Sequence, residues 1–271
     1  MIPWAVIAVC ISCWGALALW SRSLLRPGIR GGEFEANAAY WVIRAYARCF
    51  HRLRVEGAAN IPPRRSPEPR PVLFVANHTS GADPLLIQAA VPYEVRWVMA
   101  LDMRGQDGKL DWLWDFGRLI FVDRMKGEAG GLREAIRHLR RHPQPGGPPQ
   151  ALGLFPEGHI ERPERQLLPF LPGVGLVIKA AQPIVVPVVI EGTPQVDPAW
   201  ASLWTRSRAR VRFLPALDYR DSTLDAQGIA ADLRERFRRE TGWPLNEMQP
   251  RAVNGAWVYP EGVRVRRRGG M

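Results

Sequence analysis

Short apolar runs alternate along the chain with longer segments in which apolar residues recur at helical spacing. The short runs are rich in β-branched and aliphatic residues, which is typical of buried strands, and the longer segments indicate helices. This alternation predicts an α/β fold in which helices cover a mixed, largely parallel sheet. We expect strands over 71–76, 95–100, 119–123, 151–155, 184–190 and 209–214, and helices over 84–90, 127–141, 174–180 and 224–240.

The N-terminal segment has a different pattern. Residues 1–20 contain no charged side chain, and Arg22, Arg26 and Arg30 follow them. A stretch of about 20 apolar residues is just long enough to cross a hydrocarbon core of about 30 Å. The arginines favour the cytoplasm for that end, and a cleaved signal peptide would carry positive side chains before its apolar stretch. We therefore expect a retained membrane anchor and a cytoplasmic main domain, with a bacterial inner membrane as the location.

A second helical segment, over about residues 33–53, is amphipathic, with Arg44, Arg48 and Arg52 in a stripe on one face. This helix either packs on the surface of the main domain or lies in the membrane interface with its arginines against anionic head groups. In a third arrangement, the two segments form a re-entrant anchor in one leaflet. We divide the chain into membrane-associating helices (1–55), a main domain (56–245) and a basic tail (246–271).

The formal net charge of +11 suits nucleic acid or an anionic membrane about equally. Much of this charge follows the apolar segment, lines the second helix or lies at 264–268, where it suits a membrane. No zinc-finger, RNA-recognition or helix-turn-helix signature is present. We therefore expect anionic membrane lipid as a partner and no nucleic acid.

Cysteine and histidine add two expectations. The three cysteines all lie in the N-terminal helical region, so we expect no disulfide framework. The spacings of the histidines match no common zinc pattern, and we expect no metal.

The candidate chemistry lies at the end of the first predicted core strand. His78 follows the apolar run 71–76, and Asp83 comes five positions later, across a turn that enters a helix. The end of a strand is where an α/β sheet usually presents its functional groups. A carboxylate beside a histidine fixes the tautomer of the imidazole and stabilises the charge gained when it takes a proton. His78 is therefore a candidate general base, and Asp83 is its orienting group.

Three further segments follow in order: 117–124, which ends in Asp123-Arg124; 154–158, which contains Pro156-Glu157-Gly158; and 184–193, a buried run interrupted by Pro187. Together with 77–83, this series resembles the four blocks of the glycerolipid acyltransferase family, which acylates glycerol-3-phosphate and lysophosphatidic acid. The resemblance covers about the middle half of the chain and also takes in 167–170 and Gly173.

The resemblance implies a role for each block. Arg124 would bind an acceptor phosphate, because a guanidinium matches phosphate geometry. Glu157 would bind acceptor hydroxyls, and Gly158 would let the substrate approach the backbone. Pro187 would contact the acyl chain, while its place in a strand suggests an edge or a bulge.

The implied protein is a membrane-bound 1-acylglycerol-3-phosphate O-acyltransferase whose catalytic domain spans 56–245. It would transfer a fatty acyl group from acyl-CoA or acyl carrier protein, as a co-substrate and without another cofactor, to lysophosphatidic acid. The product would be phosphatidic acid, and the reaction belongs to phospholipid biosynthesis. A lipase-type hydrolase is disfavoured because the chain has no Gly-x-Ser-x-Gly run.

One block departs from the family pattern. After Gly158, where threonine, arginine and serine are common, this chain has His159-Ile160-Glu161-Arg162. The acceptor side is therefore less cationic, which leaves open another lysolipid acceptor, either a lysophospholipid with a larger head group or an amino-acid lysolipid. A non-catalytic protein that binds anionic lipid is the alternative from a different class, and the His78–Asp83 pair argues against it.

Overall fold

The computed structural model of the chain describes most of the main domain. The described residues are 9, 11–16, 19, 21, 28–30, 33–67, 69–104, 111–123, 129–141, 146–160, 165–196, 199–247, 251–253 and 256–258. Among them, no helix combines the length and the apolar character that a bilayer crossing needs. Most of the proposed anchor over residues 1–20, and Arg124, lie outside the described residues.

The centre of the molecule is one eight-stranded sheet with the strand order β1-β7-β6-β2-β5-β3-β4, and β8 pairs with β6 beside β7. Strands β2, β3, β4, β5 and β6 run parallel to one another, whereas β1, β7 and β8 run in the opposite direction. The predicted mixed, largely parallel sheet is therefore confirmed. The strands are β1 (Arg54–Glu56), β2 (Val72–Ala76), β3 (Arg96–Ala100), β4 (Ile120–Val122), β5 (Ala151–Leu154), β6 (Ile184–Glu191), β7 (Arg210–Phe213) and β8 (Leu217–Asp218).

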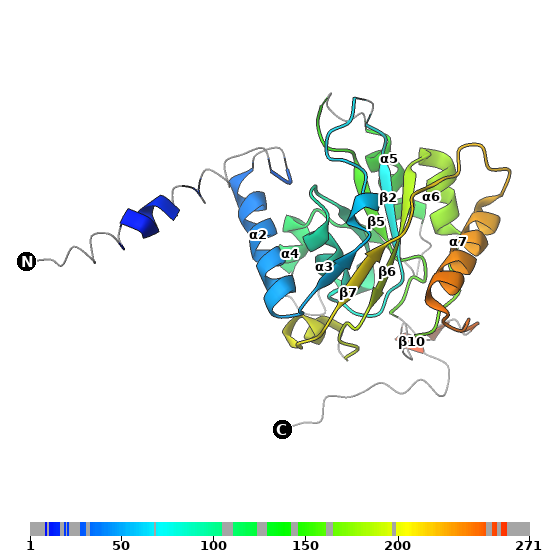
Figure 1. Cartoon of the computed structure of the whole chain (residues 1–271). Helices are drawn as coiled ribbons and strands as arrows, with labels where there is room; N and C mark the ends of the chain where they lie inside the picture. Colours follow the sequence, from blue (N-terminus) through cyan, green and yellow to red (C-terminus); the bar gives the residue numbers. More distant parts are fainter. Residues whose placement is uncertain are drawn as a thin grey trace, which may run out of the picture.

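Helices cover both faces of this sheet, α2, α3 and α4 on one side and α5, α6 and α7 on the other (Figure 1). The helices are α2 (Phe34–Cys49), α3 (Asp83–Ala90), α4 (Asp111–Phe116), α5 (Ala129–Leu139), α6 (Gly173–Ala181) and α7 (Ala226–Thr241). Short 3₁₀ helices span Ala58–Asn60, Leu101–Met103 and Ala199–Trp204, and a separate β9–β10 hairpin (Arg251–Val253, Ala256–Val258) follows α7.

Strand β2 shows why helices must cover both faces of the sheet. Its residues Val72, Phe74 and Ala76 belong to the core beneath α2 and α3, whereas Leu73 and Val75 belong to the core beneath α6 and α7. All five side chains are fully buried. A strand buried on both faces reads as a continuous apolar run, which is the pattern of a parallel α/β sheet.

Of the two positions predicted for Pro187, an edge or a bulge, the structure excludes the edge, because β6 pairs with β2 on one side and with β7 and β8 on the other. The Leu214 amide donates to the Pro187 carbonyl (2.9 Å), so the polar groups of Pro187 face the side of β7 and β8. On that side, β7 ends at Phe213 and β8 begins only at Leu217. The missing N–H of proline therefore falls at a break in the neighbouring strand, where it removes no ladder hydrogen bond.

Candidate active site

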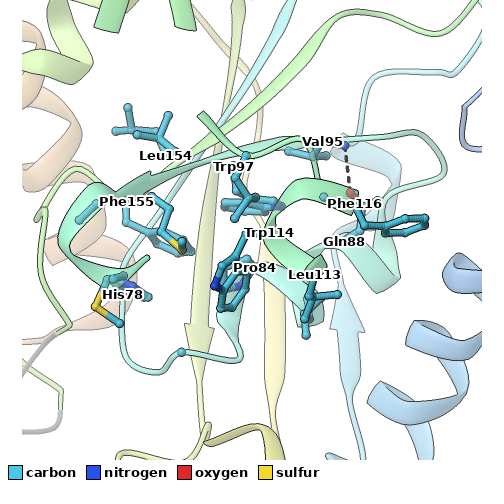
Figure 2. Close-up of a pocket in the computed structure, with 18 of the residues that line it drawn as sticks. His78, Pro84, Gln88, Val95, Trp97, Leu113, Trp114, Phe116, Leu154 and Phe155 are labelled. Atoms are coloured by element: carbon cyan, nitrogen blue, oxygen red, sulfur yellow. Dashed lines mark hydrogen bonds between the residues drawn. The ribbon is translucent and has the colours of Figure 1, made fainter. Parts of the chain in front are cut away.

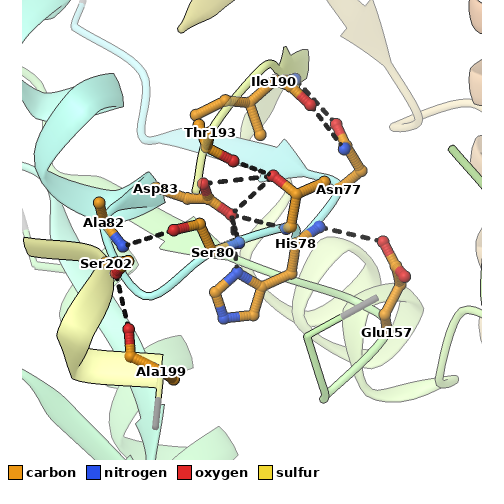
Figure 3. A network of polar contacts seen from close by, with 11 residues as sticks. Asn77, His78, Ser80, Ala82, Asp83, Glu157, Ile190, Thr193, Ala199 and Ser202 are labelled. Carbon is orange, nitrogen blue, oxygen red and sulfur yellow. Dashed lines mark hydrogen bonds and ion pairs between the residues drawn. The ribbon is translucent and has the colours of Figure 1, made fainter. Parts of the chain in front are cut away.

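The His78 side chain lies in the loop that connects β2 to α3, at the carboxyl end of the parallel strands. Its Nδ1 atom lies 3.0 Å from Oδ2 of Asp83, the first residue of α3 (Figure 3). The predicted contact between these side chains is therefore present. With the proton on Nδ1 donated to Asp83, the lone pair is on Nε2, the tautomer that a general base requires.

Asp83 is fully buried, and several donors compensate its carboxylate. The backbone amides of Thr79 and Ser80 donate to Oδ2 at 2.7 and 2.8 Å, beside the His78 contact. A buried carboxylate needs such donors, and the tight turn of 79–82 supplies them locally. The turn thus holds the carboxylate in one place against the imidazole.

Asn77 ties the same loop to the sheet. Its side-chain amide donates to the Ile190 carbonyl and accepts from the Ile190 amide, both at 2.9 Å, so it replaces a β-ladder partner where β2 leaves the sheet (Figure 3). Next to it, the hydroxyls of Thr79 and Thr193 are 2.6 Å apart. We did not assign these anchoring roles from the sequence, because the partners of Asn77 and Thr79 are more than one hundred positions away.

Glu157 approaches His78 from the turn after β5. Its side chain is only 3% exposed, and Oε1 accepts the backbone amide of His78 at 3.1 Å. Burial raises the pKa of Glu157 to about 8, and hydrogen bonds from the backbone of His78 and Leu168 only partly offset this. The Glu157 carboxyl therefore supports the backbone of the histidine loop.

A cavity of about 660 Å³ opens beside His78. It extends between α2, α3, α4 and β3, and most of its lining side chains are apolar, including Ile43 and Leu85. Trp97 and Leu113 also belong to this lining (Figure 2). A cavity of this size with an apolar wall suits a hydrocarbon chain. The candidate base His78 therefore lies at the wall of an apolar cavity.

The other predicted site residues are placed as follows. Gly158 lines the cavity and has a φ of +68°, a conformation that favours glycine. Glu157 and Pro187 are not among the described residues that line the cavity. Their contacts with substrate stay predictions, as does the phosphate contact of Arg124.

Comparisons with known proteins identify what this arrangement resembles. A family model described as Acyltransferase matches residues 52–191, just over half of the chain. The crystal structure of PlsC from Thermotoga maritima, a 1-acyl-sn-glycerophosphate (LPA) acyltransferase, is similar with a TM-score of 0.58. The alignment covers 88% of this chain and 91% of that one at 23% identity, which shows a shared fold. No curated protein sequence matches the chain significantly.

Proposed function

Since the chain belongs to the acyltransferase family, we propose that it transfers a fatty acyl group from acyl-CoA or acyl carrier protein to the free hydroxyl of 1-acyl-sn-glycerol-3-phosphate. The product is phosphatidic acid. The observation that carries this proposal is the His78–Asp83 pair, 3.0 Å apart, at the wall of a large apolar cavity. A protein that only binds lipid needs the cavity but has no use for an oriented base.

In the proposed reaction, Nε2 of His78 takes the proton of the acceptor hydroxyl as its oxygen attacks the thioester carbonyl. Asp83 holds the ring in the correct tautomer and stabilises the imidazolium, the arrangement found in serine hydrolases with the substrate hydroxyl in place of the serine. The tetrahedral intermediate collapses and expels the thiolate, which recovers the proton from His78. The acyl donor is a co-substrate, and these steps require no further cofactor.

The acceptor would be held by the loops around this base. We propose that Arg124 binds its phosphate, that Glu157 binds its glycerol hydroxyls, and that Gly158 lets it approach the backbone. Strand β4, which precedes Arg124 in the chain, runs parallel to β2 and β3, so its carboxyl end lies at the same end of the strands as the loop of His78. The acyl chain would occupy the cavity, and a contact with Pro187 would require the chain to extend beyond the described lining residues towards β6.

We further propose that the protein is attached to a membrane through its N-terminus, with the catalytic domain in the cytoplasm. The uncharged residues 1–20 support an anchor. On α2, Arg44 and Arg48 are exposed, and Trp41 is 41% exposed, which suits an anionic interface. A lipid acceptor would reach the cavity directly from such a surface.

Acyl transfer by the detergent-purified full chain tests this function. The assay compares lysophosphatidic acid with other lysophospholipids, with acyl-CoA and acyl carrier protein donors in separate arms. His78→Ala should lower turnover roughly 100-fold or more, because the hydroxyl loses its base. An unchanged melting temperature would show that the variant is folded, and near-normal activity of a folded His78→Ala would refute the mechanism.

The acceptor panel also tests the alternative head group. The sequence Gly158-His159-Ile160-Glu161 replaces the more cationic family pattern, and His159 lines the cavity. Activity that depends on His78 but is confined to another lysophospholipid would keep the reaction and reassign the acceptor. If the protein acylates no acceptor in the panel but binds vesicles, the result would favour the non-catalytic lipid-binding protein.

A further inference from the structure

Three aromatic rings form a continuous stack that ends on the proposed base. The imidazole of His78 lies on the ring of Phe155, with centroids 4.0 Å apart and planes inclined by 15°. Phe155 in turn stacks on Trp97 at 5.1 Å and 19° (Figure 2). The face of the imidazole is thus covered, while its Nδ1 edge contacts Asp83.

The sheet builds this stack from three adjacent strands. Strands β2, β5 and β3 are neighbours. His78 and Phe155 follow the carboxyl ends of β2 and β5, whereas Trp97 is the second residue of β3. Trp97 on β3 pairs directly with Gly153 on β5. A Cβ atom at Gly153 would approach Trp97 Cε3 to 2.4 Å, so the tryptophan ring occupies the space that glycine leaves free. Gly153 therefore lets Trp97 pack flat behind Phe155.

A flat aromatic partner affects a base differently from an aliphatic one. The π face of phenylalanine carries partial negative charge, so it attracts a cation placed over it. The neutral imidazole becomes a cation when it takes the hydroxyl proton. The groups that face His78 are Asp83 from α3 at Nδ1, Glu157 at its backbone amide, and the Phe155 ring. His159, on the same loop as Glu157, also lines the cavity.

We propose that Phe155 is a positioning residue for acyl transfer: its ring fixes the plane of the His78 imidazole and stabilises the imidazolium formed during the reaction. This inference rests on the proposed role of His78 as the base. Packing alone would be satisfied by any side chain of similar volume. Stabilisation of a cation requires the electrons of the ring, and this difference can be measured.

The sharpest test replaces Phe155 with phenylalanines that carry one, two or three fluorine atoms, which weaken the negative face of the ring with little change in shape. If the stack stabilises the imidazolium, kcat should fall stepwise with each fluorine, by roughly three- to thirtyfold over the series. The KM of the acyl donor should stay nearly constant. The acid limb of the kcat–pH profile should move to lower pH, because the imidazolium is less stable.

Phe155→Leu and Phe155→Tyr provide genetic controls. Leucine keeps an apolar side chain without a π face and should show both the lower kcat and the shifted pH profile, whereas tyrosine should restore most of both. The inference would be overturned if kcat did not change across the fluorinated variants, or if Phe155→Leu altered only the KM of the donor. Phe155 would then only line the cavity. His78→Ala in the same assay separates the two proposals: if it is inactive while the fluorine series is flat, only the role of Phe155 fails.

Discussion

Two buried carboxyl groups flank His78, and their surroundings differ. Asp83 accepts two backbone amides and the imidazole on one oxygen. Glu157 accepts the His78 amide in a fully enclosed position, and burial is the largest cause of its raised pKa of about 8. An acid whose pKa is raised in the folded state binds its proton more tightly there than in the unfolded chain. Folding is therefore favoured where Glu157 is protonated.

The free energy of unfolding should consequently depend on pH through Glu157. The contribution is fully present below about pH 4.5, the ordinary pKa, and is lost as the pH rises towards about 8, the folded pKa. Glu157→Gln keeps an oxygen that accepts the His78 amide but cannot ionise. Urea unfolding between pH 5 and 9 should show wild type losing stability relative to this variant, by up to a few kcal/mol. Parallel curves for the two proteins would contradict the raised pKa.

At the scale of elements, close approach of helices depends on a few small residues. Helices α6 and α7 pack side by side over one face of the sheet. A Cβ atom on Gly175 of α6 would lie 2.0 Å from the carbonyl oxygen of Ala226, the first residue of α7. A backbone oxygen cannot rotate away as a side chain can. The two helices can therefore approach this closely only because Gly175 has a hydrogen atom where other residues have a Cβ atom.

Gly175→Ala should destabilise the fold by about 1–3 kcal/mol or more, because α7 must shift to admit the methyl group. Gly130→Ala near the start of α5 is the matched control, since nothing lies within 4 Å of its Cβ position. There, the loss of chain flexibility should leave stability unchanged or raise it by up to about 1 kcal/mol. Urea unfolding of both variants measures the difference. Equal effects would mean that the α6–α7 contact relaxes freely.

At the scale of the whole molecule, the distribution of arginine matters more than the net charge. Exposed Arg44, Arg48 and Arg52 lie on or just after α2. On the opposite side of the sheet, α7 carries Arg236, Arg238 and Arg239, which form ion pairs with Asp232 and Glu235 (Figure 1). Helix α2 follows the proposed anchor in the chain and contributes residues to the cavity, whereas no described residue of α7 lines it.

Neutralising Arg44, Arg48 and Arg52 together to glutamine should weaken binding of the full chain to anionic vesicles roughly a hundredfold, at about 1 kcal/mol for each arginine. The same three substitutions at Arg236, Arg238 and Arg239 change the net charge equally and should have little effect. Vesicle sedimentation with phosphatidylcholine, with and without phosphatidylglycerol, measures this. An equal loss in both variants would show that net charge alone governs attachment.

The elements missed by the sequence analysis are the shortest ones. Helix α4 has six residues, β1 three and β8 two, and the β9–β10 hairpin is made of three-residue strands. Such segments are too short to show a period of their own. The conformation of β1 and β8 also depends on pairing with β7 and β6, which lie far away along the chain. The prediction of a sheet edge at Pro187 was wrong for the same reason. The effect of this proline depends on where β7 ends and β8 begins, and no local pattern reveals that.

The sequence by itself determined the alternating α/β architecture and the His78–Asp83 pair. Both depend on local patterns: a buried strand is a continuous apolar run, and a turn of five positions suffices to bring the carboxylate to the ring. Only the tertiary structure decided the burial of Glu157 and the two hydrogen bonds between the Asn77 side chain and the Ile190 backbone. The same is true of the cavity and of the stack of Trp97, Phe155 and His78. Each of these requires strands β2, β3, β5 and β6 to be placed side by side, and that order is set by long-range packing of both faces of the sheet, which spacing along the chain does not encode.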